Sequence, residues 1–259
     1  MREIIRYEQV DISYYEKRVV QDISFALQPG EILGIAGESG SGKSTVLRAA
    51  MGLLGRGGVV TRGDIWYGDK DLPDLSGKEL RALCGSGIAM IFQSAGNSFC
   101  PIRTVRAQLW EMMQAHGGKD AAEFEEQAQD ILAKFGFANP RRILDSYPFE
   151  LSGGMQQRVG VAAAMLLQPK LLLADEPTSA LDVTVQKQVI EEMLLARKLF
   201  GTSILLVTHN IGVIRAMADK ILIMKDGSCV EYGNTHEVMA KPQSAYTKKL
   251  LAAVPCLRR

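Results

Sequence analysis

The chain has 259 residues, enough for one large domain or two modest ones. Thirty basic residues are balanced by 29 acidic ones, and this net charge of +1 disfavours both a dedicated nucleic-acid partner and a disordered chain. The longest apolar run, Val159 to Leu167, is too short to cross a bilayer, and the first residues lack the apolar region of a secretory signal. The four cysteines are scattered and form no metal or disulfide pattern. We therefore expect a soluble, cytoplasmic globular protein.

The first third of the chain predicts strands, a glycine-rich loop and a helix. Residues 3–35 are expected to form strands, and the apolar segment 32–36 runs directly into the loop. Residues 43–54, KSTVLRAAMGLL, predict the helix that follows. Residues 63–68 predict the strand and turn of an antiparallel hairpin.

The middle of the chain is expected to be helical. The composition shifts after about residue 94, and residues 105–135 are rich in Ala, Glu, Gln and Met with few strand formers. From residue 159 apolar strands alternate with helices again, which predicts a mostly parallel sheet. The expected strands are 171–174, 204–207 and 221–224, and the expected helices are 183–199 and 211–218. The fold class is therefore α/β, with a helical insertion at about 94–160.

Residues 37–45, GESGSGKST, match the phosphate-binding pattern G-x-x-x-x-G-K-[ST]. Its glycines let the backbone curl so that N–H groups surround the β-phosphate, and the next helix presents its positive N-terminal end. Lys43 adds a mobile charge for the β- and γ-phosphates, and the Ser44 hydroxyl is placed to ligate Mg²⁺. The nucleotide-contacting residues expected here are Gly37, Ser39, Gly40, Ser41, Gly42, Lys43, Ser44 and Thr45.

An apolar run at 171–174 ends in two carboxylates, Asp175 and Glu176. A buried strand delivers such groups to the edge of the sheet where α/β proteins hold their ligands. Asp175 suits direct or water-mediated support of Mg²⁺. Glu176 suits a general base that positions and polarises the attacking water.

Residues 151–158, LSGGMQQR, look like the signature of ATP-binding cassette (ABC) ATPases. The order of motifs fits that family: the phosphate loop, Gln93, the signature, Asp175 and Glu176, the loop 179–182, and finally His209. The resemblance covers residues 3 to about 255 and implies a P-loop NTPase (RecA-like) core with an antiparallel β subdomain and an inserted α-helical subdomain. The expected division is 1–93 for the first part of the nucleotide-binding core, 94–160 for the helical subdomain with the signature, and 161–259 for the rest of the core with a short tail.

The signature is itself an expected anion site. Ser152 and the two glycines after it open a helix, so free N–H groups and a hydroxyl point outward. A second phosphate site makes sense if it closes over a nucleotide held by another subunit, and the resemblance implies two cassettes stacked head-to-tail with two ATP molecules between them. In that arrangement Ser152 and Gly154 contact the γ-phosphate, and Gly153 and Gln156 belong to the same nucleotide-binding set.

The resemblance also assigns roles to three further residues. Gln93 contacts Mg²⁺ and the attacking water, and it reports the nucleotide state to the helical insertion. His209 matches the family's switch histidine, which contacts the γ-phosphate. Asp182 matches the residue that couples the two sites of the dimer. The expected catalytic residues are therefore Glu176, His209 and Gln93.

Adenine binding calls for an aromatic face from an early strand. Tyr14 lies 29 positions before Lys43, which resembles the family's usual spacing. Tyr15 is adjacent and would point to the opposite face of a strand. We favour Tyr14 and keep Tyr15 as the alternative.

The segments SYPFELSGGMQQR and SAYTKKLL resemble the peptide/nickel importer subfamily. This implies a peripheral subunit at the cytoplasmic side of the cell membrane that binds ATP and Mg²⁺ and hydrolyses ATP. Its implied partners are two transmembrane permease subunits, a second ATPase subunit (a paralogue or a second copy) and, indirectly, an extracytoplasmic solute-binding protein. Peptide-importing members commonly continue into a cysteine-rich extension, whereas this sequence stops at Arg259. The sequence therefore favours nickel or a metal chelate over short peptides as the cargo.

Two alternatives remain. An exporter, lipid or cell-division cassette would not be expected to carry SAYTKKLL. A non-transport ABC ATPase acting on DNA or ribosomes would be expected to carry a long coiled-coil insertion or two linked cassettes. The balanced charge also disfavours a nucleic-acid partner.

Overall fold

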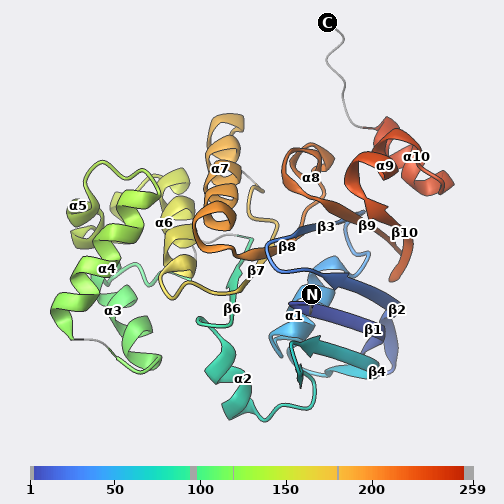
Figure 1. Ribbon diagram of the computed structural model, residues 1–259, viewed down its shortest axis with the longest axis horizontal. Helices are drawn as coiled ribbons and strands as arrows, with labels where there is room; N and C mark the ends of the chain where they lie inside the picture. The colour runs from blue at the N-terminus through green and yellow to red at the C-terminus, as the bar shows by residue number, and fades with distance from the viewer. Residues whose placement is uncertain (1–2, 94–97, 119, 180, 254–259) are drawn as a thin grey trace, which may run out of the picture. The chain divides into compact units, whose positions relative to one another are not determined.

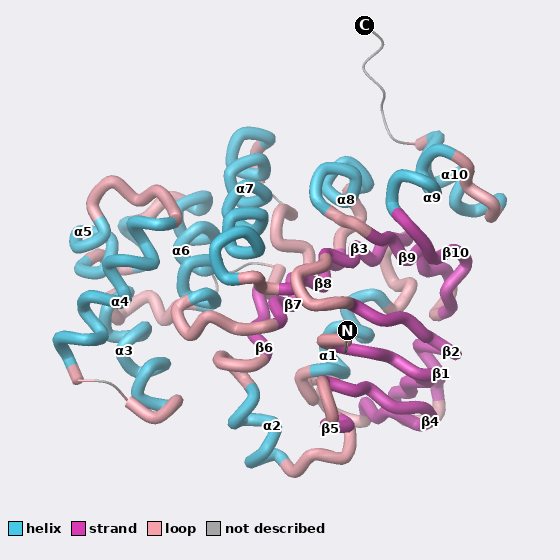
Figure 2. The backbone as a smooth tube through the Cα atoms, in the orientation of Figure 1, coloured by secondary structure: helices cyan, strands magenta, loops and turns pink. Residues whose placement is uncertain are grey.

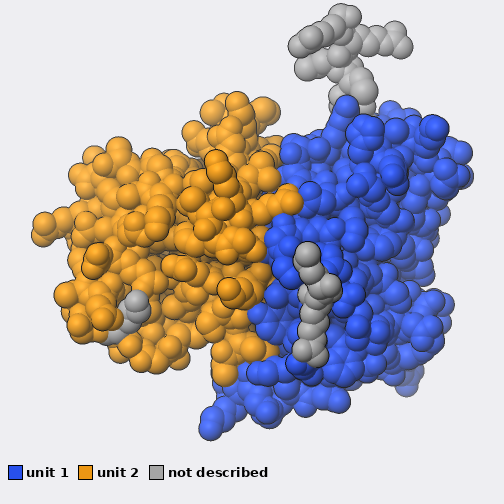
Figure 3. All heavy atoms as spheres, viewed as in Figure 1, with its two compact units in different colours: residues 1–81, 173–176, 203–259 blue, residues 82–172, 177–202 orange. Residues whose placement is uncertain are grey.

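A computed structural model describes residues 3–93, 98–118, 120–179 and 181–253. The chain divides into two compact units (Figure 3). Unit 1 comprises Met1–Arg81, Leu173–Glu176 and Ser203–Arg259, and unit 2 comprises Ala82–Leu172 and Pro177–Thr202. Among the described residues, no helix combines the length and the apolar character needed to span a membrane.

Unit 1 contains an antiparallel sheet with the strand order β2-β1-β4-β5 (Figures 1 and 2). Its strands are β1 (Ile5–Tyr14), β2 (Lys17–Leu27), β4 (Gly58–Tyr67) and β5 (Lys70–Asp71). A bulge at Gln9, where φ is 49°, shifts the buried face of β1 from Ile5 and Tyr7 to Val10 and Ile12.

The second sheet of unit 1 holds the phosphate-binding pattern. Its strand order is β10-β9-β3-β8-β7, and the residues of β7 from Leu173 onward belong to this unit. The strands are β3 (Ile32–Gly37), β7 (Leu171–Asp175), β8 (Ser203–Val207), β9 (Lys220–Lys225) and β10 (Ser228–Asn234). β3 pairs in parallel with β8 and β9, while β10 pairs antiparallel with β9. β3, β7 and β8 are buried throughout, as expected for central strands covered on both faces.

Helices join and cover the sheets of unit 1. They are α1 (Lys43–Ala50), α8 (Ile211–Met217), α9 (Thr235–Ala240) and α10 (Ala245–Ala252), while α2 (Gly77–Leu83) crosses into unit 2. α1 contacts strands of both sheets, and the buried Tyr7 hydroxyl donates a hydrogen bond to the Val46 carbonyl oxygen at 2.7 Å. α8 packs on β3 so closely that a Cβ at Gly34 would lie 2.8 Å from the Ile214 side chain.

Unit 2 is mainly helical and also contains β6 (Ile88–Ile91) and the first residues of β7. Its helices are α3 (Val105–Ala115), α4 (Ala121–Lys134), α5 (Pro140–Asp145), α6 (Gly153–Met165) and α7 (Val183–Phe200). Each begins at a polar side chain that accepts a hydrogen bond from a backbone N–H of the first turn, and these caps are Thr104, Asp120, Asn139, Ser152 and Asp182.

The α/β class with an antiparallel sheet and a helical part is confirmed. The helix predicted at 43–54 ends earlier, at Ala50, and Gly52 has a φ of 63°. The helical stretch 105–135 is two helices, because Gly117 and Gly118 both have positive φ and break it. The boundaries at 94 and 160 stay a prediction. Ala180 and residues 254–259, which include the tail at Arg259, lie outside the described residues.

Candidate functional site

The phosphate-binding loop connects β3 to α1 in unit 1. Gly37 has a φ of 151°, and a Cβ there would lie 2.2 Å from the Met224 carbonyl oxygen of β9. Gly42 has a φ of 94° and forms the N-cap of α1. The turn after β9 also holds the loop, since the Gly227 N–H donates to the Ser41 carbonyl oxygen at 3.2 Å. The glycines therefore allow the loop to curl while lying tightly against the end of β9.

Lys43 is buried and bends back over its own loop. Its Nζ donates to the Gly37 carbonyl oxygen at 2.9 Å and to the Glu38 carbonyl oxygen at 2.7 Å. Burial lowers the pKa of the Lys43 ammonium, and the carboxylates of Glu176, Asp175 and Glu38 oppose that effect. The loop thus carries a positive charge that its first two carbonyl groups hold in place.

Asp175 ends β7 and joins two side chains of α1. The Ser44 hydroxyl donates to Asp175 Oδ1 at 2.6 Å, and Arg48 Nη2 lies 3.4 Å from Asp175 Oδ2. Asp175 is only 2% exposed. A hydroxyl oxygen and a carboxylate oxygen at hydrogen-bonding distance are hard ligands of the kind that Mg²⁺ prefers, so Ser44 and Asp175 fit a magnesium site.

Glu176 follows directly and adopts a φ of 50°, which is strained for a residue other than glycine. Its Oε1 accepts a hydrogen bond from the His209 backbone N–H at 3.0 Å and lies 2.9 Å from His209 Nδ1. Its Oε2 is buried and has no hydrogen-bond partner in the described part of the chain. A buried carboxylate oxygen without a partner is costly, so this atom is suited to bind a water molecule or another donor.

The two candidate adenine partners, Tyr14 and Tyr15, lie at the end of β1 and differ in backbone conformation and exposure. Tyr14 is half-buried and pairs with Lys17 and Gly58 in the sheet. Tyr15 occupies the turn with a φ of 54°, is 75% exposed, and its ring covers Gly57. Both belong to unit 1, as the phosphate loop does. The preference for Tyr14 stays a prediction.

The signature lies in unit 2, where its two glycines have different environments. The Ser152 hydroxyl caps α6 and accepts a hydrogen bond from the Met155 N–H at 3.3 Å. Among the described residues, a Cβ at Gly153 would meet nothing within 4 Å, whereas a Cβ at Gly154 would lie 2.9 Å from the Val185 side chain of α7. Gly154 therefore permits close packing of two helices, while Gly153 leaves the capped helix end open to solvent.

Three other predicted residues also lie in unit 2 and make contacts within it. Gln156 Nε2 donates to the carbonyl oxygens of Pro148 and Leu151, at 2.7 Å and 3.0 Å, which fixes the turn before the signature. Asp182 caps α7, and the Gln93 carbonyl oxygen accepts a hydrogen bond from the Ser179 hydroxyl at 3.3 Å. Unit 1 thus brings together the phosphate loop, Asp175, Glu176 and His209, while Gln93, the signature and Asp182 belong to unit 2.

Comparison with known proteins agrees with these motifs. Residues 20–179 match the family model described as ABC transporter. The chain belongs to the ABC transporter family. It is 42% identical over 238 residues to the dipeptide transport ATP-binding protein of Escherichia coli, covering 92% of this chain and 73% of that protein. It is also 42% identical over 238 residues to the oligopeptide transport ATP-binding protein of Salmonella typhimurium, covering 92% and 71%.

A solved structure supports the same conclusion. It is the dimeric, post-hydrolysis state of an ATP-binding cassette bound to ADP and phosphate, with 26% identity and a TM-score of 0.77. The match covers 89% of this chain and 98% of that one. This protein is therefore an ATP-binding ABC ATPase of the kind that powers transport, and its P-loop NTPase fold is confirmed.

Sequence reasoning missed two polar contacts of this ABC ATPase. Arg48, which contacts Asp175, lies four residues after Ser44 on α1, so helical spacing alone would place both on one face. Gln157 of the signature donates through Nε2 to the Pro177 carbonyl oxygen at 2.7 Å. No spacing rule gives that second contact, because it depends on how α6 packs beside the loop that follows β7.

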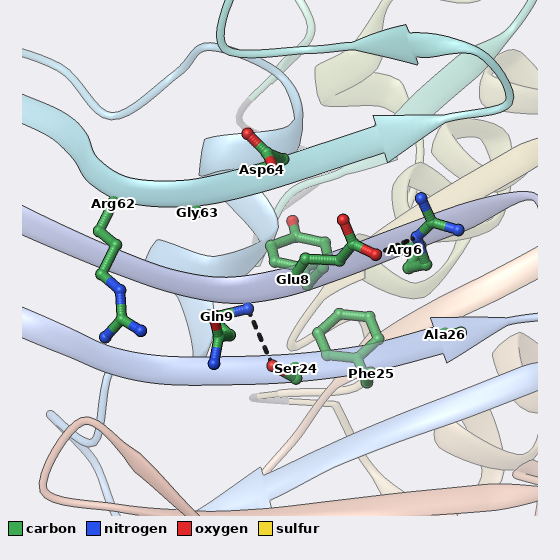
Figure 4. A pocket seen from close by; sticks show the side chains of 10 residues that line it. Arg6, Glu8, Gln9, Ser24, Phe25, Ala26, Arg62, Gly63 and Asp64 are labelled. Carbon is green, nitrogen blue, oxygen red and sulfur yellow. Dashed lines mark hydrogen bonds and ion pairs between the residues drawn. The ribbon is translucent and has the colours of Figure 1, made fainter.

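A pocket of about 580 Å³ lies elsewhere on unit 1, over the strands β1, β2 and β4 (Figure 4). Two contacts join polar groups that line it: Arg6 Nε lies 3.0 Å from Glu8 Oε1 in an ion pair, and the Gln9 N–H donates to the Ser24 hydroxyl at 2.9 Å. No residue of the phosphate loop lines it. The pocket is therefore separate from the nucleotide chemistry of this ABC ATPase.

Proposed function

We propose that this chain is the ATP-hydrolysing subunit of a peptide importer, bound peripherally at the cytoplasmic side of the membrane to two permease subunits. The relatives reported above are named for dipeptide and oligopeptide transport, which supports peptides as the cargo class. An external solute-binding protein would deliver the cargo to the permeases. Nickel or a metal chelate, the cargo that the sequence favoured, stays the alternative prediction.

The observation that carries the enzymatic proposal is the state of the Glu176 carboxylate. His209 binds one oxygen, and the other is buried without a partner among the described residues. This second oxygen accepts the proton of the attacking water while the first keeps the side chain oriented. His209 is 68% exposed at its side chain, so its ring is free to turn from Glu176 toward the γ-phosphate of bound ATP.

The remaining residues of unit 1 bind and orient the nucleotide. Lys43 and the loop N–H groups bind the β- and γ-phosphates, and Tyr14 stacks on adenine. Ser44 and Asp175 would hold Mg²⁺, with Gln93 as a further ligand. When bound, the ion would neutralise charge that develops on the phosphate oxygens.

The signature completes the site of a second ATPase subunit, which is either a second copy of this chain or a paralogue. Ser152 and Gly153 are exposed at the start of α6, where N–H groups and the helix dipole attract an anion. Ser152 and Gly154 contact the γ-phosphate held by the partner, Gly153 and Gln156 belong to the same nucleotide-binding set, and Asp182 couples the two sites. ATP binding then favours the closed dimer, and hydrolysis releases it.

ATP should promote dimerisation of the Glu176→Gln variant, and adding Ser152→Arg should weaken that dimer at least about tenfold, because the arginine fills the anion site. Sedimentation at several protein concentrations with ATP measures the effect. Ser76→Arg is the matched control, since Ser76 is an exposed serine whose hydroxyl also accepts an N–H near a helix start, from Glu79 at 3.4 Å. An intact dimer in the Ser152→Arg protein would exclude the composite site.

A strain lacking the gene should lose uptake of a radiolabelled dipeptide and keep uptake of radiolabelled nickel. Restoring the wild-type gene should restore dipeptide uptake, whereas the Glu176→Gln gene should not. Loss of nickel uptake with normal dipeptide uptake would refute the peptide assignment and leave the ATPase assignment in place.

A further inference from the structure

The C-terminal helix α10 touches the phosphate-binding loop. The Glu38 N–H, in the second residue of the loop, donates a hydrogen bond to the Tyr246 hydroxyl at 3.2 Å. The two residues are 208 positions apart, and both belong to unit 1. The contact joins the SAYTKKLL segment to the pattern that defines the nucleotide site.

The body of unit 1 fixes the position of this tyrosine. Tyr246, Leu250 and Leu251 pack on a buried cluster that includes Ala36, the residue before the loop. The ammonium of Lys225, the last residue of β9, lies 5.4 Å from the centre of the Tyr246 ring.

Hydrogen bonds to β10 also fix the segment that precedes α10. The Glu231 carboxylate of β10 accepts hydrogen bonds from the N–H groups of Gln243 and Ser244, at 2.7 Å and 3.0 Å. Ser244 then caps α10, and its hydroxyl accepts the Tyr246 N–H at 3.2 Å. The hydroxyl of Tyr246 is therefore aimed at the loop by packing, by a cation and by the helix cap.

The hydrogen bond acts on the peptide group that Lys43 uses. The Gly37 carbonyl and the Glu38 N–H belong to one planar peptide unit, so fixing one end fixes the other. Lys43 Nζ binds the carbonyl end at 2.9 Å, and Tyr246 binds the N–H end at 3.2 Å. Hydrogen bonds that share a peptide group in this way polarise one another.

We propose that Tyr246 is a positioning residue of the ATP site, which fixes the Gly37–Glu38 peptide and thereby the orientation of the Lys43 ammonium. The proposal rests on the proposed role of Lys43 in binding phosphates. It gives the SAYTKKLL segment a task inside the ATPase itself, separate from any contact with a permease.

The test compares Tyr246→Phe with Tyr232→Phe. Both variants keep the ring and lose one hydroxyl, and the Tyr232 hydroxyl donates to the Ala26 carbonyl oxygen at 3.2 Å, away from the loop. Loss of one neutral hydrogen bond should raise the Kd and KM for ATP about three- to tenfold in Tyr246→Phe and leave kcat within about twofold. Tyr232→Phe should leave all three constants unchanged, and the two variants should melt at similar temperatures.

A second measurement does not depend on activity. The Glu38 amide should exchange with solvent faster in Tyr246→Phe than in wild type or Tyr232→Phe, as followed by NMR. Equal ATP affinities for the two variants, or an unchanged Glu38 exchange rate, would overturn the positioning role. Wild-type protein that fails to bind or hydrolyse ATP would instead refute the function on which the proposal rests.

Discussion

Glu176→Gln is expected to lower kcat for ATP hydrolysis at least about hundredfold, because a positioned general base contributes rate factors of that size. Glutamine has nearly the same shape and keeps an oxygen that can accept the His209 N–H, now 3.0 Å from Glu176 Oε1. What the substitution removes is the negative charge and the proton acceptor at Oε2. The Kd for ATP should therefore stay within about threefold of wild type. Phosphate release and equilibrium ATP binding, measured on the same preparation, separate the two effects.

Glu31→Gln is the matched control for this experiment. The side chains of Glu31 and Glu176 are similarly buried, at 15% and 13% exposure, and both accept a backbone N–H. Glu31 pairs with Lys220 at 3.0 Å and takes no part in the proposed site. Loss of the Glu31 charge should lower the free energy of unfolding without changing the rate of ATP hydrolysis by the folded protein. Wild-type hydrolysis by Glu176→Gln would falsify the general-base assignment.

Lys43→Ala is expected to weaken ATP binding at least about hundredfold. Each hydrogen bond from a charged donor is worth about 1.5–3 kcal/mol, and the ammonium would serve two phosphate groups. The substitution also leaves the carbonyl oxygens of Gly37 and Glu38 without the donor that holds them at 2.9 Å and 2.7 Å. The loop should thus lose both its charge and its order. Calorimetric titration with ATP and Mg²⁺ measures the change.

Lys220→Ala is the control for Lys43→Ala. It removes one lysine charge from unit 1 without touching the phosphate loop, so it separates a general effect of lost charge from the loss of the Lys43 ammonium. Lys220 begins β9 and pairs with Leu33 near the start of β3, at the opposite end of these strands from the loop. Its removal breaks the ion pair with Glu31 and should leave ATP affinity unchanged. If Lys43→Ala bound ATP with wild-type affinity, the assignment of this loop as the phosphate-binding site would be refuted.

Local patterns predicted the parts of the site that lie close together in sequence. Three parts of the site each depend on a few neighbouring residues: the loop around Lys43, the carboxylates at the end of β7 and the cap at Ser152. A short sequence motif is therefore enough to predict the local conformation of each part. Contacts between distant segments could not be predicted in this way. The bond from Glu38 to Tyr246 spans 208 positions, and its existence depends on how α10 packs.

The register of β1 shows a similar limit. In each half of the strand, apolar residues alternate with polar ones as expected for one buried face. The bulge at Gln9 shifts this alternation by one residue, so odd-numbered positions are buried before it and even-numbered apolar positions after it. Its cause lies partly in β4, where Gly63 has a φ of 78° and a Cβ would lie 2.2 Å from the Glu8 carbonyl oxygen. A single strand's sequence cannot contain that information, because the neighbouring strand supplies half of it.

The two glycines of the signature, Gly153 and Gly154, have different surroundings, so different contacts limit which residues can replace them. A side chain at Gly154 would have to displace the Val185 side chain of α7, whatever the subunit binds. A Cβ at Gly153 would meet no described atom within 4 Å, so packing in the described part of the subunit leaves this position open, and the proposed contact with the partner's nucleotide is the constraint expected there. In a lineage that no longer used the proposed partner site, Gly153 would be expected to vary while the residue at position 154 stayed small.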